Sequence, residues 1–202
     1  MKENHVVHVI DDDEAVRESL AFLLLAAGHT ARTYPSADAF LGVLDDTDRG
    51  CVVTDVRMPG TDGLVLVDRL RNRSATLPVI VITGHADIPL AVRAIKAGAW
   101  NFIEKPFEDG MILNAVDAAL QQEKLARAEN ATVGVIRDRI SALTVRERQV
   151  LAGLLEGQAN KVIARDLGIS PRTIEIHRAN LMMKMHASSL SDLVRMALLA
   201  ND

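Results

Sequence analysis

Five residues with side chains suited to phosphoryl chemistry each lie where a short apolar run of the sequence ends: Asp11, Asp12, Asp55, Thr83 and Lys105. Runs such as Val6–Ile10 and Cys51–Asp55 are rich in β-branched residues and are followed by Asp or Pro-Gly signals, a pattern typical of buried strands. The carboxyl ends of parallel strands share one edge of a sheet, where ligands and chemistry gather. We therefore expect three carboxylates, a hydroxyl and an ammonium to converge on one rim.

An acidic pocket of this composition is suited to a divalent cation and to phosphoryl transfer. Carboxylates that lie close together repel one another unless a cation neutralises them, and a few carboxylates with water suit Mg²⁺. Asp55 can then act as the nucleophile, while the Lys105 ammonium and the Thr83 hydroxyl stabilise the charge on the transferred phosphoryl oxygens. Asp13 is better assigned to the cap of a first helix than to the metal.

Two enzyme classes and one structural interpretation compete with this prediction. Aspartates at strand ends are often merely solvated, but five suitable residues in this order favour a site. A haloacid-dehalogenase-type phosphohydrolase needs a second acid two residues after its nucleophile, and Arg57 occupies that position. A dinucleotide-binding fold needs a G-x-G-x-x-G after the first strand, which the sequence lacks. The residues thus favour a phosphoacceptor site.

The elements that must position these residues alternate between strand-like and helix-like segments up to about residue 124. We expect strands near residues 6–10, 29–34, 51–55, 78–82 and 101–104. We expect helices at residues 14–27, 36–44, 63–73 and 89–97, and a fifth that begins near residue 109. Because each parallel strand needs a crossover helix, this repetition predicts an α/β fold with a doubly wound, five-stranded parallel sheet covered on both faces.

Residues 5 to about 124 resemble the receiver domain of two-component response regulators. The residues that carry the resemblance are Asp11-Asp12, Asp55 with Met58-Pro59-Gly60 and Gly63, Thr83, and Lys105-Pro106. The resemblance implies a flavodoxin-like domain that a partner sensor histidine kinase phosphorylates on Asp55.

The same resemblance implies roles for the residues around Asp55. The Mg²⁺ ligands would be Asp12, Asp55 and the carbonyl group of Arg57, with Asp11 acting through water. Thr83 would move towards the phosphoryl group, and Phe102 would turn inward. These movements would remodel the face that the fourth helix, the fifth strand and the fifth helix form.

From residue 141 onward only helical signals remain, and residues 160–179 have the spacing of a helix-turn-helix. Gly168 permits a tight turn, Ser170 caps a second helix, and Pro171 takes its first position. Ile174 and His177 lie at helical spacing on the inner face of this helix. The outward residues, available to base edges in a major groove, are Arg172, Glu175, Ile176, Ala179 and Asn180. The candidates for phosphate contacts are Lys161, Thr173 and Arg178.

Residues 143–151, together with Asn160-Lys161 and Arg172-Thr173, resemble the LuxR/NarL-type DNA-binding domain. The resemblance implies four helices and a dimer whose contact is the last helix, residues 189–200. Sigma-factor C-terminal domains have similar opening residues, but the receiver-like segment disfavours that class. One alternative stays open at this point, namely a helical hairpin that binds protein or RNA instead of duplex DNA.

Charge and composition set further limits on the class of protein. The net charge is −4; residues 1–140 carry 15 Lys and Arg against 21 Asp and Glu, and residues 141–202 carry 8 against 6. This asymmetry suggests two modules with different partners. No apolar run approaches the ~18 residues of a membrane span, and the first residues lack a signal-peptide pattern. We expect the one cysteine, Cys51, to be a small core side chain. A single cysteine cannot form an intramolecular disulfide, which is consistent with a reducing cytoplasm.

Over nearly its full length the chain resembles response regulators of the FixJ type, which regulate nitrogen-fixation genes and other pathways. We predict a receiver domain at residues 1–124, a helical linker at 125–140 and a LuxR-type DNA-binding domain at 141–202. The expected protein is a cytoplasmic transcription activator and not an enzyme. It would dimerise on phosphorylation, bind double-stranded promoter DNA of nitrogen-fixation or oxygen-responsive genes, and act with RNA polymerase, without a membrane partner.

Overall fold

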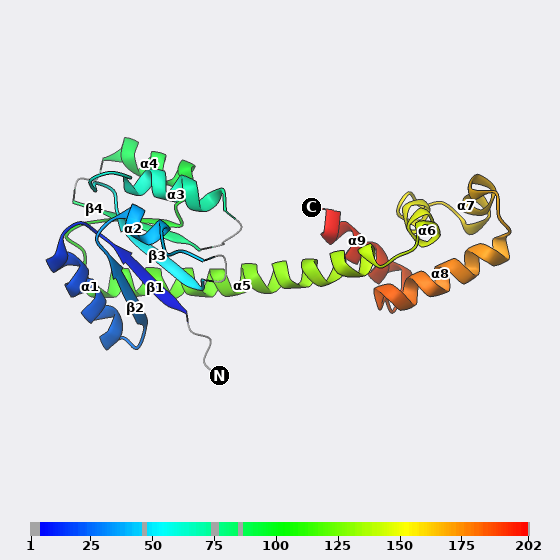
Figure 1. The fold of residues 1–202 in the computed structure, drawn as a ribbon, viewed down its shortest axis with the longest axis horizontal. Helices are drawn as coiled ribbons and strands as arrows, with labels where there is room; N and C mark the ends of the chain where they lie inside the picture. Colours follow the sequence, from blue (N-terminus) through cyan, green and yellow to red (C-terminus); the bar gives the residue numbers. More distant parts are fainter. Residues whose placement is uncertain (1–4, 46–47, 74–76, 85–86, 202) are drawn as a thin grey trace. The chain divides into compact units, whose positions relative to one another are not determined.

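The computed structural model describes residues 5–45, 48–73, 77–84 and 87–201. The chain divides into two compact units, Met1–Arg127 and Ala128–Asp202. Figure 1 shows the elements of both units. None of the helices in the described ranges is long and apolar enough to cross a membrane.

The described strands of the first unit form a five-stranded parallel sheet in the order β2-β1-β3-β4-β5. Their bounds are β1 Val6–Ile10, β2 Thr30–Tyr34, β3 Gly50–Asp55, β4 Val79–Thr83 and β5 Asn101–Glu104. Every residue of β1, β3 and β4 is buried, as expected for strands covered on both faces. Because β3 lies between β1 and β4, its last residue, Asp55, lies at the middle of the sheet's carboxyl edge.

Helices cover both faces of this sheet (Figure 1). Their bounds are α1 Glu14–Ala26, α2 Ala37–Leu41, α3 Gly63–Arg71, α4 Ile88–Ala97 and α5 Asp109–Ser141. One core contains side chains of α2, α3 and α4, and the other contains side chains of α1 and the first part of α5. The doubly wound α/β fold expected from the alternating pattern is therefore confirmed.

Local signals set most of the helix ends in this unit. Asp13 caps α1 by accepting a hydrogen bond from the Ala15 amide at 2.9 Å, as expected. Ser36 caps α2, but this helix ends at Leu41 and not at residue 44 as expected. The reason is visible in the backbone, where the Val43 amide bonds to the carbonyl of Phe40 and tightens the chain into a turn.

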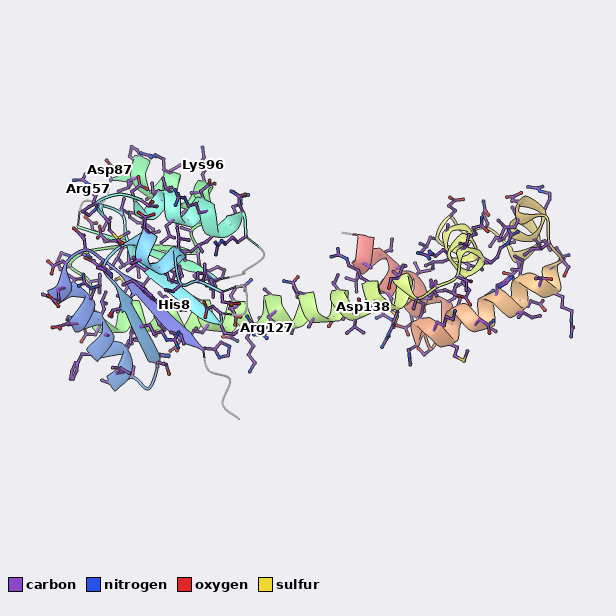
Figure 2. All side chains as sticks on the ribbon, viewed as in Figure 1. His8, Arg57, Asp87, Lys96, Arg127 and Asp138 are labelled. Atoms are coloured by element: carbon purple, nitrogen blue, oxygen red, sulfur yellow. The ribbon has the colours of Figure 1, made fainter. Side chains whose placement is uncertain are left out.

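His8, the middle residue of β1, is buried within the first unit (Figure 2). Its ring packs against Tyr34 and Phe40, and its Nδ1 lies 3.2 Å from the Tyr34 hydroxyl oxygen. Its Nε2 has no hydrogen-bond partner among the residues that the structure describes. Burial disfavours the imidazolium form and lowers the pKa of His8 from 6.5 to about 4.

We expect His8 to make the first unit sensitive to acid. The unfolded chain binds a proton on His8 below pH 6.5 and the folded chain only below about 4, so stability falls as pH drops between these values. The full shift corresponds to about 3 kcal/mol. In urea titrations between pH 7 and 4.5, wild type should lose stability more steeply than His8→Phe. Parallel losses in the two proteins would contradict a buried neutral imidazole.

Cys51, in β3, is a fully buried core residue, as the sequence predicts. Burial, followed by the Glu123 and Asp117 carboxylates, raises the pKa of its thiol to about 12. The thiol is therefore protonated and inert at neutral pH.

The second unit is helical, and its core also includes the last part of α5. Its other helices are α6 Val145–Leu155, α7 Asn160–Leu167, α8 Pro171–Met185 and α9 Leu190–Asn201. Ile136 of α5 is buried in this core. Two arginines of α5 fix neighbouring helix ends, because Arg139 donates to the Met185 carbonyl at 2.9 Å and Arg137 donates to the Ala200 carbonyl at 3.1 Å. Residues 125–140, expected as a helical linker, are part of the continuous helix α5. The last turns of α5 pack with the second unit.

Candidate phosphoacceptor site and helix-turn-helix

The centre of the first site is the carboxylate of Asp55, which is 8 % exposed at the end of β3. Its Oδ1 accepts a hydrogen bond from Lys105 Nζ at 2.9 Å. Its Oδ2 accepts one from the Arg57 amide at 2.6 Å, which fixes the plane of the carboxylate. Gly63 N–H donates to the Val56 carbonyl at 2.9 Å, so α3 begins directly against this strand end.

Lys105 joins Asp55 to a second buried carboxylate, Asp11, which is 2 % exposed. The Lys105 Nζ to Asp11 Oδ2 distance is 2.8 Å, and Asp11 Oδ1 accepts from the Asp13 amide at 2.9 Å. Burial alone would lower the pKa of Lys105, but its hydrogen bonds to the two carboxylates outweigh that effect and raise the pKa above its usual value. The ammonium therefore stays charged throughout the physiological range and holds the two carboxylates together.

The remaining residues expected at this rim lie around that triad. Thr83 is buried at the end of β4, and its carbonyl accepts from the Lys105 amide at 2.8 Å. Phe102, on β5, is half-buried against the core that contains α4. Asp12 and the Arg57 side chain are exposed.

The structure gathers two of the three expected carboxylates. Within the described ranges, no group of three or more His, Cys, Asp or Glu side chains is arranged to hold a metal ion. Asp11 turns inward to the Asp13 amide and Lys105, whereas the next residue, Asp12, remains exposed. The donors that do meet are carboxylate oxygens at a strand end, the hard ligands that Mg²⁺ prefers, so their chemistry fits that ion.

Sequence reasoning missed two contacts that shape the site. Arg17 of α1 donates to the Asp11 carbonyl at 2.7 Å, and Asp38 of α2 accepts from the Thr61 hydroxyl at 2.7 Å. Asp38 and Thr61 are 23 positions apart and carry no shared motif, so the sequence offered no signal for that pair.

The second candidate site is the pair α7 and α8, which has the local geometry of the predicted helix-turn-helix. Gly168 ends α7 with a φ of 65°, a left-handed conformation that glycine adopts readily. Ser170 caps α8 by accepting from the Thr173 amide at 3.1 Å, and the two hydroxyl oxygens lie 2.8 Å apart. Ile174 is buried and His177 is half-buried, as expected for the inner face.

The residues assigned to DNA contact divide by exposure. Exposed side chains occupy positions Lys161, Arg172, Glu175, Ile176 and Ala179, and Thr173, Arg178 and Asn180 are half-buried. Arg178 donates to the Asn160 side-chain oxygen at 3.3 Å, which ties α8 to the start of α7.

An ion pair between a buried glutamate and a half-buried lysine, missed from the sequence, supports α8 near its other end. Glu147 of α6 is buried, forms a reciprocal capping box with Thr144, and accepts from Lys184 Nζ at 2.7 Å. The hydrogen bond from Lys184, followed by that from the Thr144 amide, lowers the pKa of Glu147. The Thr-x-x-Glu spacing before an apolar run was the available signal for the box.

Comparison with known proteins matches two stretches of the chain to known protein families. Residues 7–117 match the response regulator receiver domain, and residues 141–197 match the LuxR family of bacterial regulatory proteins. The transcriptional regulatory protein FixJ of Azorhizobium caulinodans is 57 % identical over 201 residues, which cover 99 % of this chain and 95 % of that protein.

The chain belongs to the two-component response regulators.

Solved structures agree with this assignment. The response regulator StyR matches with a TM-score of 0.83 at 41 % identity, over 97 % of this chain and 99 % of that one. Full-length FixJ from B. japonicum matches with a TM-score of 0.60 at 48 % identity, over 99 % and 98 %. This response regulator is thus of the FixJ type with a LuxR-type DNA-binding domain, a class of transcription regulators and not of enzymes.

Proposed function

We propose that a sensor histidine kinase phosphorylates this response regulator on Asp55, and that the phosphorylated protein dimerises and activates transcription in the cytoplasm. The observation that carries the proposal is the Lys105 ammonium held between Asp11 and Asp55 at the carboxyl edge of the sheet. A buried carboxylate beside a fixed cation is arranged to accept a phosphoryl group, because the cation can hold the added negative charge. Receiver, linker and DNA-binding domain would comprise residues 1–124, 125–140 and 141–202.

In the proposed reaction an Asp55 carboxylate oxygen attacks the phosphorus of a phosphohistidine. The P–N bond breaks as the new P–O bond forms, and the imidazole of the kinase, protonated on its other ring nitrogen, leaves as the neutral base with the bonding electrons. The proposed ligands of Mg²⁺ are Asp12, Asp55 and the Arg57 carbonyl, with Asp11 acting through water. The ion would neutralise charge on the phosphoryl oxygens. The Arg57 amide orients Asp55, and Lys105 exchanges its contact with Asp55 for one with a phosphoryl oxygen.

The proposed output of the receiver is a dimer through the face of α4, β5 and α5. In α4, Ile88, Val92 and Ile95 are 82 %, 46 % and 54 % exposed, and their spacing places them on one side of the helix. Movement of Thr83 and Phe102 after phosphorylation would change this face, since both lie on strands next to α4. Phosphorylation would thus favour the dimerising state of a two-state equilibrium.

Light scattering tests this proposal directly. With Mg²⁺ and acetyl phosphate, the wild-type molar mass should double, whereas Asp55→Asn should remain at the mass it has without the phosphodonor. Intact mass spectrometry reports the phosphoryl group independently. Dimerisation of Asp55→Asn to the same extent would refute Asp55 as the switch.

The proposed DNA site is a two-fold promoter element, read by one α8 from each subunit and bound by RNA polymerase alongside. Half-sites about one helical turn apart would suit a dimer of this kind. The resemblance to the FixJ type supports nitrogen-fixation or oxygen-responsive genes as its targets.

We expect two substitutions in the second unit to separate base reading from phosphate contact. Glu175→Ala should alter base preference, because an exposed carboxylate on α8 can accept from cytosine N4. Lys161→Ala should weaken binding to all sequences and reduce the salt dependence by about one phosphate contact. Selection from a randomised duplex and salt titrations measure these effects. An unchanged preference in Glu175→Ala would remove that residue from the reading set.

A further inference from the structure

The loop between Asp55 and α3 is held by a residue from outside that loop. Asp38, an exposed residue of α2, accepts two hydrogen bonds from Thr61, from its hydroxyl at 2.7 Å and from its amide at 3.3 Å. Gly60 adopts a φ of 81°, and a Cβ atom there would lie 3.0 Å from Asp38 Oδ2. Asp38 therefore fits closely against the tip of this loop.

The rest of the loop connects this contact to the phosphoacceptor. Val56 continues the sheet by donating to the Ile82 carbonyl at 3.1 Å, Met58 is buried in the core, and Asp62 caps α3. Between these anchors lies Arg57, whose amide donates to Asp55 Oδ2 at 2.6 Å. Thr61 lies four residues after Arg57 in the same loop, and its contact with Asp38 restrains the far end of that loop.

We propose that Asp38 is a positioning residue for phosphorylation, acting through Thr61 to hold the Arg57 amide on Asp55. The inference rests on the proposed phosphorylation of Asp55. Asp38 contacts no reacting atom, so its effect is confined to the geometry of the loop. Arg69, 3.6 Å from Asp38 with both side chains more than half exposed, contributes little to this contact.

Amide hydrogen exchange, measured without a phosphodonor, tests the positioning itself. Asp38→Ala should speed exchange at Arg57 and Thr61 by roughly 3- to 10-fold, the effect of losing one ordinary hydrogen bond. Amides within β3 should exchange as in wild type. Thr61→Val, which removes the hydroxyl and keeps the amide, should speed exchange at Arg57 but by less than Asp38→Ala. Thr61→Ser, which keeps both donors, should behave as wild type.

Phosphorylation by acetyl phosphate with saturating Mg²⁺, followed by intact mass, tests the consequence. Asp38→Ala should be phosphorylated about 3- to 10-fold more slowly, and adding it to Thr61→Val should cause a smaller further loss than it causes in wild type. Asp68→Ala, which removes an exposed carboxylate of α3, is the matched control for charge.

The outcomes separate this inference from the proposed function. A wild-type protein that gains no phosphoryl group would refute the phosphorylation of Asp55. If the wild type is phosphorylated and Asp38→Ala is phosphorylated at the same rate, the role of Asp38 would be overturned. It would also be overturned if Asp68→Ala were phosphorylated as slowly as Asp38→Ala. Altered exchange at Arg57 without altered rate would overturn it as well.

Discussion

Gly63→Ala is expected to unfold or distort the phosphoacceptor site. A Cβ atom at Gly63 would lie 2.1 Å from the Asp55 carbonyl oxygen and 3.0 Å from its carbonyl carbon, and both belong to the backbone of a buried strand. No side chain can move aside, so the start of α3 or the end of β3 must shift. We expect the free energy of unfolding to fall by roughly 3 kcal/mol, which is at the upper end of the usual cost of overpacking a core. The protein that remains folded should be phosphorylated slowly.

Gly110→Ala is the matched control for this substitution. Gly110 lies in the first turn of α5, and a Cβ atom there would meet nothing within 4 Å. Since alanine favours helix over glycine, that variant should be unchanged or more stable by up to about 1 kcal/mol. Urea denaturation compares the two variants. A Gly63→Ala protein as stable as Gly110→Ala would show that the close approach of α3 to Asp55 is not required.

Lys105→Met should lower the free energy of unfolding of the first unit and should abolish the response to phosphorylation. It leaves Asp11 and Asp55, which are 2 % and 8 % exposed, without the cation that both contact. Removing one partner of a buried ion pair typically costs 3–5 kcal/mol; since Lys105 is partly exposed, we expect about 2–4 kcal/mol. Denaturation in the absence of divalent ions measures this loss.

Added Mg²⁺ should restore part of the stability of Lys105→Met, because a second cation can neutralise the same carboxylates. Light scattering with acetyl phosphate should show no dimer, since Lys105 is the group proposed to hold the phosphoryl oxygens. A variant that dimerises normally would assign that role to another residue.

The convergence of Asp11, Asp55 and Lys105 could be predicted from the sequence because strand ends in a parallel sheet share one edge. The direction in which each side chain points could not be predicted from the sequence. Asp11 and Asp12 look equivalent in the sequence, and a hydrogen bond from the Asp13 amide turns Asp11 inward. The Asp38–Thr61 contact could not be predicted either, because it joins a residue of α2 to a loop residue 23 positions later, and no sequence motif links the two.

The continuous helix α5 was only partly predictable. Its middle is rich in Ala, Glu, Arg and Gln, which favour helix but do not tell a free linker from a packed element. The informative signal was Ile136 and Ile140 at i, i+4, an apolar pair that packs into the core of the second unit. Because the rest of the segment is polar, this pair alone could not separate a packed helix from an exposed one.

The inert thiol of Cys51 has a practical consequence for spectroscopy. Because the natural chain has one cysteine, and that cysteine is buried with a pKa of about 12, a maleimide will not react with it in the folded protein. A cysteine introduced at any exposed position would then be labelled selectively, without replacing a native core residue. Fluorophores or spin labels can thus be placed on either unit of the unaltered scaffold.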